Sequence, residues 1–163
     1  MKPFRHIRFR WLAPFWFLVF AGGADAANCN LAVPNPFAFG AYDTISNLDI
    51  AVDFTVSCTK TAAGTENVNV VVTFSSGSGT FATRTMSNGV STLNYNLYKD
   101  AARTQVRGDG SGTTVTGTAN FTLTNAQPSA SAAGTIYGRV FGGQDVSAGN
   151  YSTTTPITVT MTF

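Results

Sequence analysis

A regular alternation of apolar and polar residues over most of the chain constrains the fold more than any other feature. Apolar side chains occupy every second position, with threonine, serine or asparagine mostly in between. Such period-two patterning is typical of half-buried antiparallel strands, and β-branched threonine suits their solvent-facing side. The clearest runs are residues 50–58, 68–74, 93–97, 114–123 and 157–163, with shorter ones at 28–33 and 136–141.

Turn-forming residues separate these runs. Glycine- and serine-rich stretches occur at 75–79, 87–89, 108–112 and 142–143, and they favour turns between strands. A 3.6-residue apolar repeat is missing, and one short helical turn is expected at 100–103. About seven strands without a repeat or dividing linker predict a single all-β domain, an antiparallel immunoglobulin-like β-sandwich.

The first 26 residues have the order of a secretory signal peptide. A basic stretch, residues 1–10, precedes an apolar stretch, residues 11–20, and Ala24-Asp25-Ala26 fits the cleavage rule. The apolar stretch is shorter than the roughly 20 residues of a membrane span. We therefore expect a signal peptide over 1–26, a mature domain over 27–163 with no membrane anchor, and export to the periplasm and then the cell surface.

Removing the signal changes the chemistry that remains. The chain has ten basic and eight acidic residues, but residues 27–163 hold six and seven, and they lack both histidine and tryptophan. Without a net basic charge, binding to nucleic acid is not expected. Without histidine, the commonest general base and metal ligand is absent.

Cys29 and Cys58 are the only cysteines. A single even pair in an oxidising compartment favours a disulfide. A metal site or a reactive thiol is the alternative, although two cysteines without histidine make a poor zinc site.

The sequence gives little support to an enzymatic function. Serine and threonine are abundant, but no histidine can activate them. Lys60 and Lys99 would serve as bases only if buried, and the acidic residues are scattered, with no pair at a spacing that suggests a glycosidase. We expect no enzyme, no cofactor and no metal site.

Two further features have both a functional and a structural interpretation. Arg107-Gly108-Asp109 spells the integrin-binding tripeptide RGD, although such a sequence arises easily by chance in a glycine-rich turn. The tyrosines at 95, 98, 137 and 151 could stack on sugars, but packing in the core is the favoured interpretation.

Several ordered motifs, covering residues 29–163, resemble one known family. A central motif at 94–103 is followed by Gly108-Asp109-Gly110, and an Arg-x-Met precedes it. The motif residues are Phe39, Gly40, Tyr42, Arg84, Met86, Tyr95, Asn96, Leu97, Tyr98, Gly108, Asp109, Gly110, Tyr137, Gly138, Gly149 and Tyr151. The pattern is similar to that of the spore coat protein U domains.

This resemblance implies a fold, a role and partners. Members of this family resemble subunits of archaic chaperone–usher pili, which act in adhesion and biofilm formation, and a self-assembling spore coat protein. Their immunoglobulin-like sandwich lacks one strand, which a periplasmic chaperone and later a neighbouring subunit supply at the outer-membrane usher. The family places its disulfide where Cys29 and Cys58 lie.

On this basis the C-terminal run is the predicted assembly strand, an edge read by a chaperone or partner. Its apolar residues are Ile157, Val159, Met161 and Phe163. Two alternatives remain: a self-complete secreted binding module for carbohydrate or a surface ligand, and a stand-alone spore or cell-coat protein.

The sequence departs from the family pattern at three points. Arg107 stands where tryptophan is frequent, and Thr153 stands where aspartate often follows the late Gly-x-Tyr motif. Only Ala27 and Asn28 precede Cys29 in the predicted mature chain, whereas a donor segment is expected there. The hypothesis is that the chain accepts a donor strand but gives none, unless the start or the cleavage site lies elsewhere.

Overall fold

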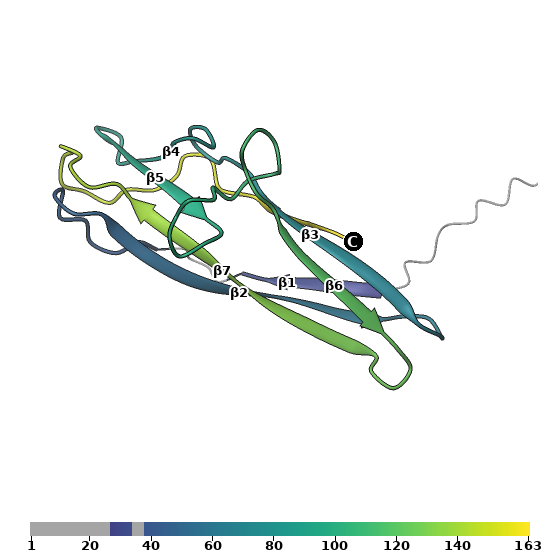
Figure 1. Ribbon diagram of the computed structural model, residues 1–163. Coiled ribbons are helices and arrows are strands. Elements are labelled where there is room, and N and C mark those ends of the chain that lie inside the picture. The colour runs from purple at the N-terminus through teal and green to yellow at the C-terminus, as the bar shows by residue number, and fades with distance from the viewer. Residues whose placement is uncertain (1–26, 34–37) are drawn as a thin grey trace, which may run out of the picture.

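The computed structural model describes residues 27–33 and 38–163, which form two antiparallel sheets packed face to face (Figure 1). One sheet has the order β1-β2-β7-β5-β4 and the other has the order β6-β3-β8. The strands are β1 (Ala27–Ala32), β2 (Leu48–Lys60), β3 (Glu66–Phe74), β4 (Arg84–Ser87), β5 (Thr92–Tyr98), β6 (Gly117–Leu123), β7 (Ser129–Val140) and β8 (Val159–Thr162). The described part contains no helix, so the predicted all-β sandwich is confirmed. The predicted signal peptide lies outside these residues.

The long pair β2–β7 shows how the sequence pattern determines the layers. Leu48 pairs with Val140, and the register continues without a break to Thr59 opposite Ser129. Phe54, Val56 and Cys58 are buried, while the residues between them are exposed. Period-two alternation therefore places one face of the strand in the core, as expected.

The structure has more strand than the sequence predicted. β4 was not expected, because Arg84-Thr85-Met86-Ser87 is a mostly polar segment. β7 starts at Ser129 rather than near 136, since small residues at its inner positions, Ala130 and Ala132, hid the pattern. The strand expected over 114–123 begins at Gly117, because Val115 pairs with the segment around Arg107 instead of with β3.

The core lies between the two sheets. Buried side chains of β2, β5 and β7 on one side meet those of β3 and β6 on the other. The rings of Phe54 and Phe74 make an edge-on contact across the layers, with centroids 6.4 Å apart.

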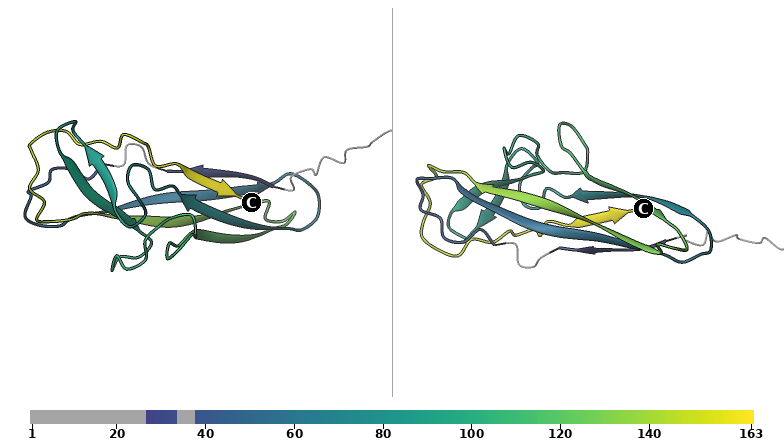
Figure 2. Two further views of the ribbon diagram at one scale, coloured as in Figure 1. Left: turned by 90° about the horizontal axis from the view of Figure 1, so that it is seen from above. Right: turned by 60° about the horizontal axis from the view of Figure 1, so that its bottom comes forward.

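The connection from β7 to β8 crosses from one sheet to the other. On its way Ser152 forms two backbone hydrogen bonds with Ser87 of β4, at 2.8 and 3.1 Å. This path brings β8 beside β1, as both views in Figure 2 show. Two edge strands from different sheets therefore lie on the same side of the sandwich.

Candidate functional site

The side of the sandwich between β1 and β8 is open. β1 pairs with β2 and β8 pairs with β3, but β1 and β8 are in different sheets and are not paired with each other. Leu31 of β1 and Val159 and Met161 of β8 point toward the core yet are only half-buried. By comparison, the inner positions of β3 and of the second half of β2, from Phe54 to Cys58, are buried. The core is therefore incompletely covered along this flank.

A groove of about 560 Å³ runs between these two edges. Its floor includes Phe74, Leu97 and Ile136, which come from three strands of the core. Leu31 and Val159 line its opposite walls. Among the described residues, none that lines this groove is charged, so its surface offers apolar contacts and the free backbone edges of two strands.

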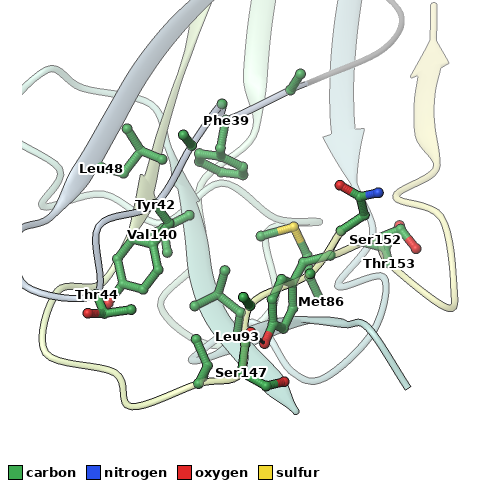
Figure 3. A pocket seen from close by; sticks show the side chains of 18 residues that line it. Phe39, Tyr42, Thr44, Leu48, Met86, Leu93, Val140, Ser147, Ser152 and Thr153 are labelled. Atoms are coloured by element: carbon green, nitrogen blue, oxygen red, sulfur yellow. Dashed lines mark hydrogen bonds between the residues drawn. The ribbon is translucent and has the colours of Figure 1, made fainter. Parts of the chain in front are cut away.

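The groove continues into a larger cavity of about 920 Å³, because Phe39, Met86 and Thr153 line both. Figure 3 shows this cavity, with Phe39 and Tyr42 from the segment before β2 and Leu93 from β5. The Tyr42 hydroxyl donates to the carbonyl of Phe141 at 2.7 Å and accepts from the backbone amide of Gln144 at 3.1 Å.

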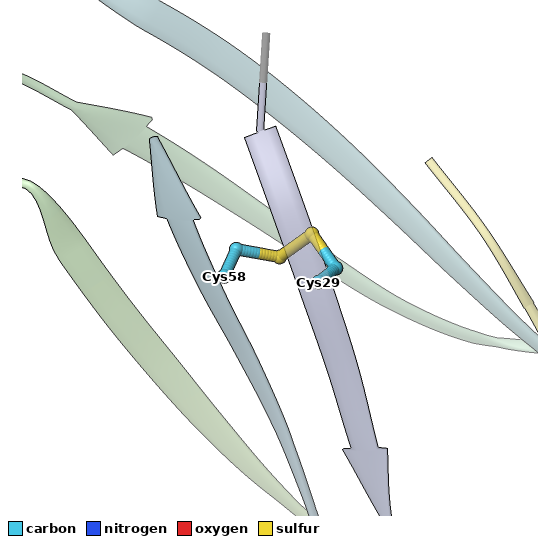
Figure 4. The surroundings of a disulfide bond; sticks show 2 residues. All are labelled: Cys29 and Cys58. Atoms are coloured by element: carbon cyan, nitrogen blue, oxygen red, sulfur yellow. A yellow bond between two sulfur atoms is a disulfide. The ribbon is translucent and has the colours of Figure 1, made fainter. Parts of the chain in front are cut away.

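A disulfide holds one wall of the groove in place. Cys29 of β1 lies directly opposite Cys58 of β2, and their sulfur atoms are bonded (Figure 4). The bond confirms the sequence prediction. It attaches the edge strand β1 covalently to its neighbour, whose Cys58 is fully buried.

Two of the motif residues, Arg84 of β4 and Asn96 of β5, form a buried polar network with backbone carbonyls of the neighbouring loops. The Arg84 guanidinium donates to the Asn96 side-chain oxygen and to the carbonyls of Ser75, at 3.1 Å, and Arg107, at 2.7 Å. Asn96 in turn donates to the carbonyls of Phe81 and Ala82. Arg84 is fully buried, and this burial lowers the pKa of its guanidinium. These motif residues thus fix the loops around β4 and β5.

Arg107 is buried as well, which excludes the integrin interpretation of its tripeptide. Its side chain is only 3% exposed. The guanidinium lies against the rings of both Phe54 and Phe74, whose centroids are 5.3 and 5.2 Å from the guanidinium carbon. An RGD motif must present its arginine to a receptor, and this one is enclosed by the core. The arginine occupies an apolar position, in keeping with the tryptophan that the resemblance led us to expect there.

The remaining motif residues shape turns and close contacts. Gly40 and Gly110 have φ values of +89° and +90°, a region that favours glycine. A Cβ on Gly108 would lie 2.5 Å from the Thr114 side chain. The Tyr151 hydroxyl donates to the Ser147 carbonyl at 2.7 Å, and Gly149 lies against the Asn88 side chain.

Two of the four tyrosines considered for sugar stacking are enclosed by the core. Tyr95 and Tyr98 are buried, and this burial raises the pKa of both. The half-buried Tyr137 lies beneath the Arg103 guanidinium, 6.0 Å from its ring centroid. The core-packing interpretation therefore describes Tyr95 and Tyr98.

The acidic residues likewise take structural positions. Asp49 accepts two hydrogen bonds from Arg139, at 2.7 and 2.8 Å, and lies 3.2 Å from Arg103. Asp109 accepts from the Ser111 amide and hydroxyl within its own turn. Over the two described segments, no three metal-ligating side chains gather in one place, and no helix there could cross a membrane.

Sequence reasoning singled out half of the twelve residues that line the groove, although not as parts of one site. Ile157 and Val159 of the predicted assembly strand line it, and of the motif residues Phe39, Met86, Tyr95 and Leu97 do so. Leu31, Val33, Phe74 and Ile136 were not singled out as site residues. Their only signal was membership of alternating runs, which does not tell which strand will be an edge.

The fold and its open flank define a class of protein: an immunoglobulin-like sandwich of the pilin type. The sequence model of the Spore Coat Protein U domain matches residues 16–160, and the chain belongs to that family. A similar solved chain comes from the crystal structure of the CsuC–CsuE chaperone–tip adhesion subunit pre-assembly complex from archaic chaperone–usher Csu pili of Acinetobacter baumannii. The two share 15% identity with a TM-score of 0.53, and the match covers 84% of this chain but 40% of that one. A search of the curated proteins gave no match.

Proposed function

We propose that this protein is a non-catalytic secreted subunit of a surface pilus or coat that accepts a donor strand in the groove between β1 and β8. The observation that carries the proposal is the pair of unpartnered edges flanking a groove without charged residues. Strand addition supplies what such a site needs, because backbone hydrogen bonds extend the sheet while alternate side chains fill the groove.

The expected donor is an extended segment with apolar side chains at alternate positions. Along β8 it would extend the three-stranded sheet, and its inward side chains would cover Phe74, Leu97 and Ile136. Leu31, Val159 and Met161 would then become buried like the rest of the core. Burial of apolar area at roughly 25 cal/mol per Å² drives such an insertion.

The wider role follows from the same proposal. Family membership supports a coat or pilus subunit, and the likeness to a chain from a chaperone–tip adhesion subunit complex supports a chaperone as a partner. The proposed partners are accordingly a periplasmic chaperone, an outer-membrane usher and neighbouring subunits. Export to the periplasm, display on the cell surface, and a part in adhesion and biofilm formation complete the proposal.

A pull-down of the tagged mature chain from its native periplasm, followed by light scattering, tests the proposal. A one-to-one complex with a chaperone is expected. Val159→Lys and Met161→Lys should each abolish the complex, because they place a charge on the inner face of β8. Thr160→Lys is the matched control, since Thr160 is exposed on the outer face of the same strand.

Two results would overturn the proposal. One is a stable free monomer that captures no chaperone, which would indicate a self-complete domain. The other is a complex that survives both inner-face lysines as well as it survives the control.

A further inference from the structure

The first half of β7 is a second open edge, remote from the groove. β7 pairs with β2 along residues 129–140, but β5 pairs with it only from Tyr137 to Val140. Residues 129–136 therefore have a strand neighbour on one side alone. Figure 1 shows this stretch of β7 at the border of its sheet, on the side away from β2 and β1.

Two hydrogen bonds made along this strand identify the backbone groups of β7 that face away from β2. The amide of Phe141, just past the end of β7, donates to the carbonyl of Asn94 in β5, and the carbonyl of Thr135 accepts from the Arg107 side chain at 3.0 Å. Since alternate residues of a strand direct their amide and carbonyl to the same side, Ser131 and Ala133 face outward too. Within the described residues, no hydrogen bond reaches the backbone groups of these two.

This edge lacks the devices that usually keep strand edges apart. Natural sheets protect edges with charged side chains, prolines, bulges or covering segments. Residues 110–138 contain no charged side chain at all, and the register with β2 runs through residues 129–140 without a bulge. Arg107 covers the edge at Thr135, and beyond it the side chains are serine, alanine and glycine.

We propose that this edge binds the same edge of a second copy of this chain. An antiparallel pair related by a two-fold axis at Ala132 places Ser131 opposite Ala133 of the second copy and brings the outward groups of both into register. Such a contact is self-complementary, as two-fold interfaces must be. Because the segment is uncharged and its side chains are small, identical edges can approach without charge repulsion between the two segments.

The contact is independent of the groove. β1 and the open half of β7 lie on opposite sides of β2 in the same sheet, so a copy whose groove is filled can still pair. Subunits carrying this edge would associate side by side, in addition to any association through a donor strand.

Cross-linking of an Ala132→Cys variant tests the inference directly. Residues on the axis of such a pair face each other with Cα atoms about 4.5 Å apart, close enough for a disulfide. The purified mature chain, free or with its chaperone, should give a disulfide-linked dimer under mild oxidation. Asn150→Cys, on an exposed loop, is the control and should give far less dimer.

Light scattering supplies a second measurement. The unaltered chain should approach a doubled mass as its concentration rises, whereas Ser131→Pro should stay monomeric because proline removes an outward amide and spares the ladder to β2. A mass independent of concentration, together with equal cross-linking of the two cysteine variants, would overturn the inference. Loss of the chaperone complex alone would contradict the proposed function and leave this contact standing.

Discussion

The ring of Phe39 lies against the backbone of Gly138, where a Cβ atom would come within 2.7 Å of the ring and 2.9 Å of the Ile50 side chain. Phe39 also makes an edge-on contact with Tyr95, with ring centroids 5.4 Å apart. The glycine of β7 thus makes room for an aromatic residue that lines both the groove and the neighbouring cavity.

Gly138→Ala should lower the free energy of unfolding by about 1–3 kcal/mol, because the added methyl group forces the ring from its position. Phe39→Leu in the same chain should recover part of the loss. Urea denaturation of the single and double variants measures this coupling. Additive losses would show that the two positions do not act on each other.

Removal of the disulfide should destabilise the domain by about 3–4 kcal/mol, as expected for a closed loop of this length. The variant is Cys29→Ser with Cys58→Ser, compared with the oxidised chain by chemical denaturation. Reducing agent should produce a loss of similar size in the unaltered chain and none in the variant. A loss under 1 kcal/mol would contradict a structural role for the bond.

Arg84→Ala should cost about 3 kcal/mol or more, because the carbonyls of Ser75 and Arg107 lose their guanidinium donor and the Asn96 oxygen retains the Leu97 amide but loses the charged donor. Asn96→Ala should be destabilising too, and the double variant should lose less than the sum, since both residues belong to one network. Thermal or urea unfolding of the four proteins gives the interaction energy. A double variant whose loss of stability equals the sum of the two single losses would contradict this prediction.

Arg107→Met should be tolerated within about 1 kcal/mol or should stabilise the fold. The guanidinium is buried, and its Nε and Nη1 atoms have no hydrogen-bond partner. Replacing a buried charge by an apolar side chain of similar volume is often neutral or favourable, and methionine packs well on aromatic rings. Arg107→Ala, which leaves a cavity beside Phe54 and Phe74, should cost about 2–4 kcal/mol. Equal losses of stability in Arg107→Met and Arg107→Ala would contradict this account.

The contribution of Asp49 should depend on pH. The hydrogen bond from Arg139, and then the charge of Arg103, hold the pKa of Asp49 below its ordinary value. The stabilisation is therefore fully present above the unfolded pKa, about 3.9, and is lost as the pH falls through the lower folded pKa. The stability difference between Asp49→Asn and the unaltered chain should be constant near neutrality and shrink below about pH 4. Asp145→Asn, at an exposed carboxylate, is the control and should show a smaller difference throughout.

The fold was largely predictable from sequence because period two is a local property. Each alternating run from Ile50 onward corresponds to a strand in the structure, and the two cysteines pair as expected. β4 and the first half of β7 were missed because Arg84 is buried through hydrogen bonds and Ala130 and Ala132 are too small to mark an inner face.

The groove was harder to predict from the sequence than the strands. Which strands become edges depends on pairings between distant segments, as when the long connection after β7 brings Val159 beside Leu31. The burial of Arg107 was equally hidden, because an arginine in a glycine-rich turn is normally exposed. Only the arrangement of Phe54 and Phe74 around it explains its position.

The neutrality of the groove lining has a consequence for kinetics. Under the proposed function, an incoming segment meets no charged side chain among the described residues that line the groove, so the lining itself adds no electrostatic steering and added salt should change its contribution to the rate of entry little. Discrimination between rival segments must then come from the size and spacing of their side chains. The speed of assembly would be governed by local concentration, which a carrier or a tethering platform can raise and ionic conditions cannot.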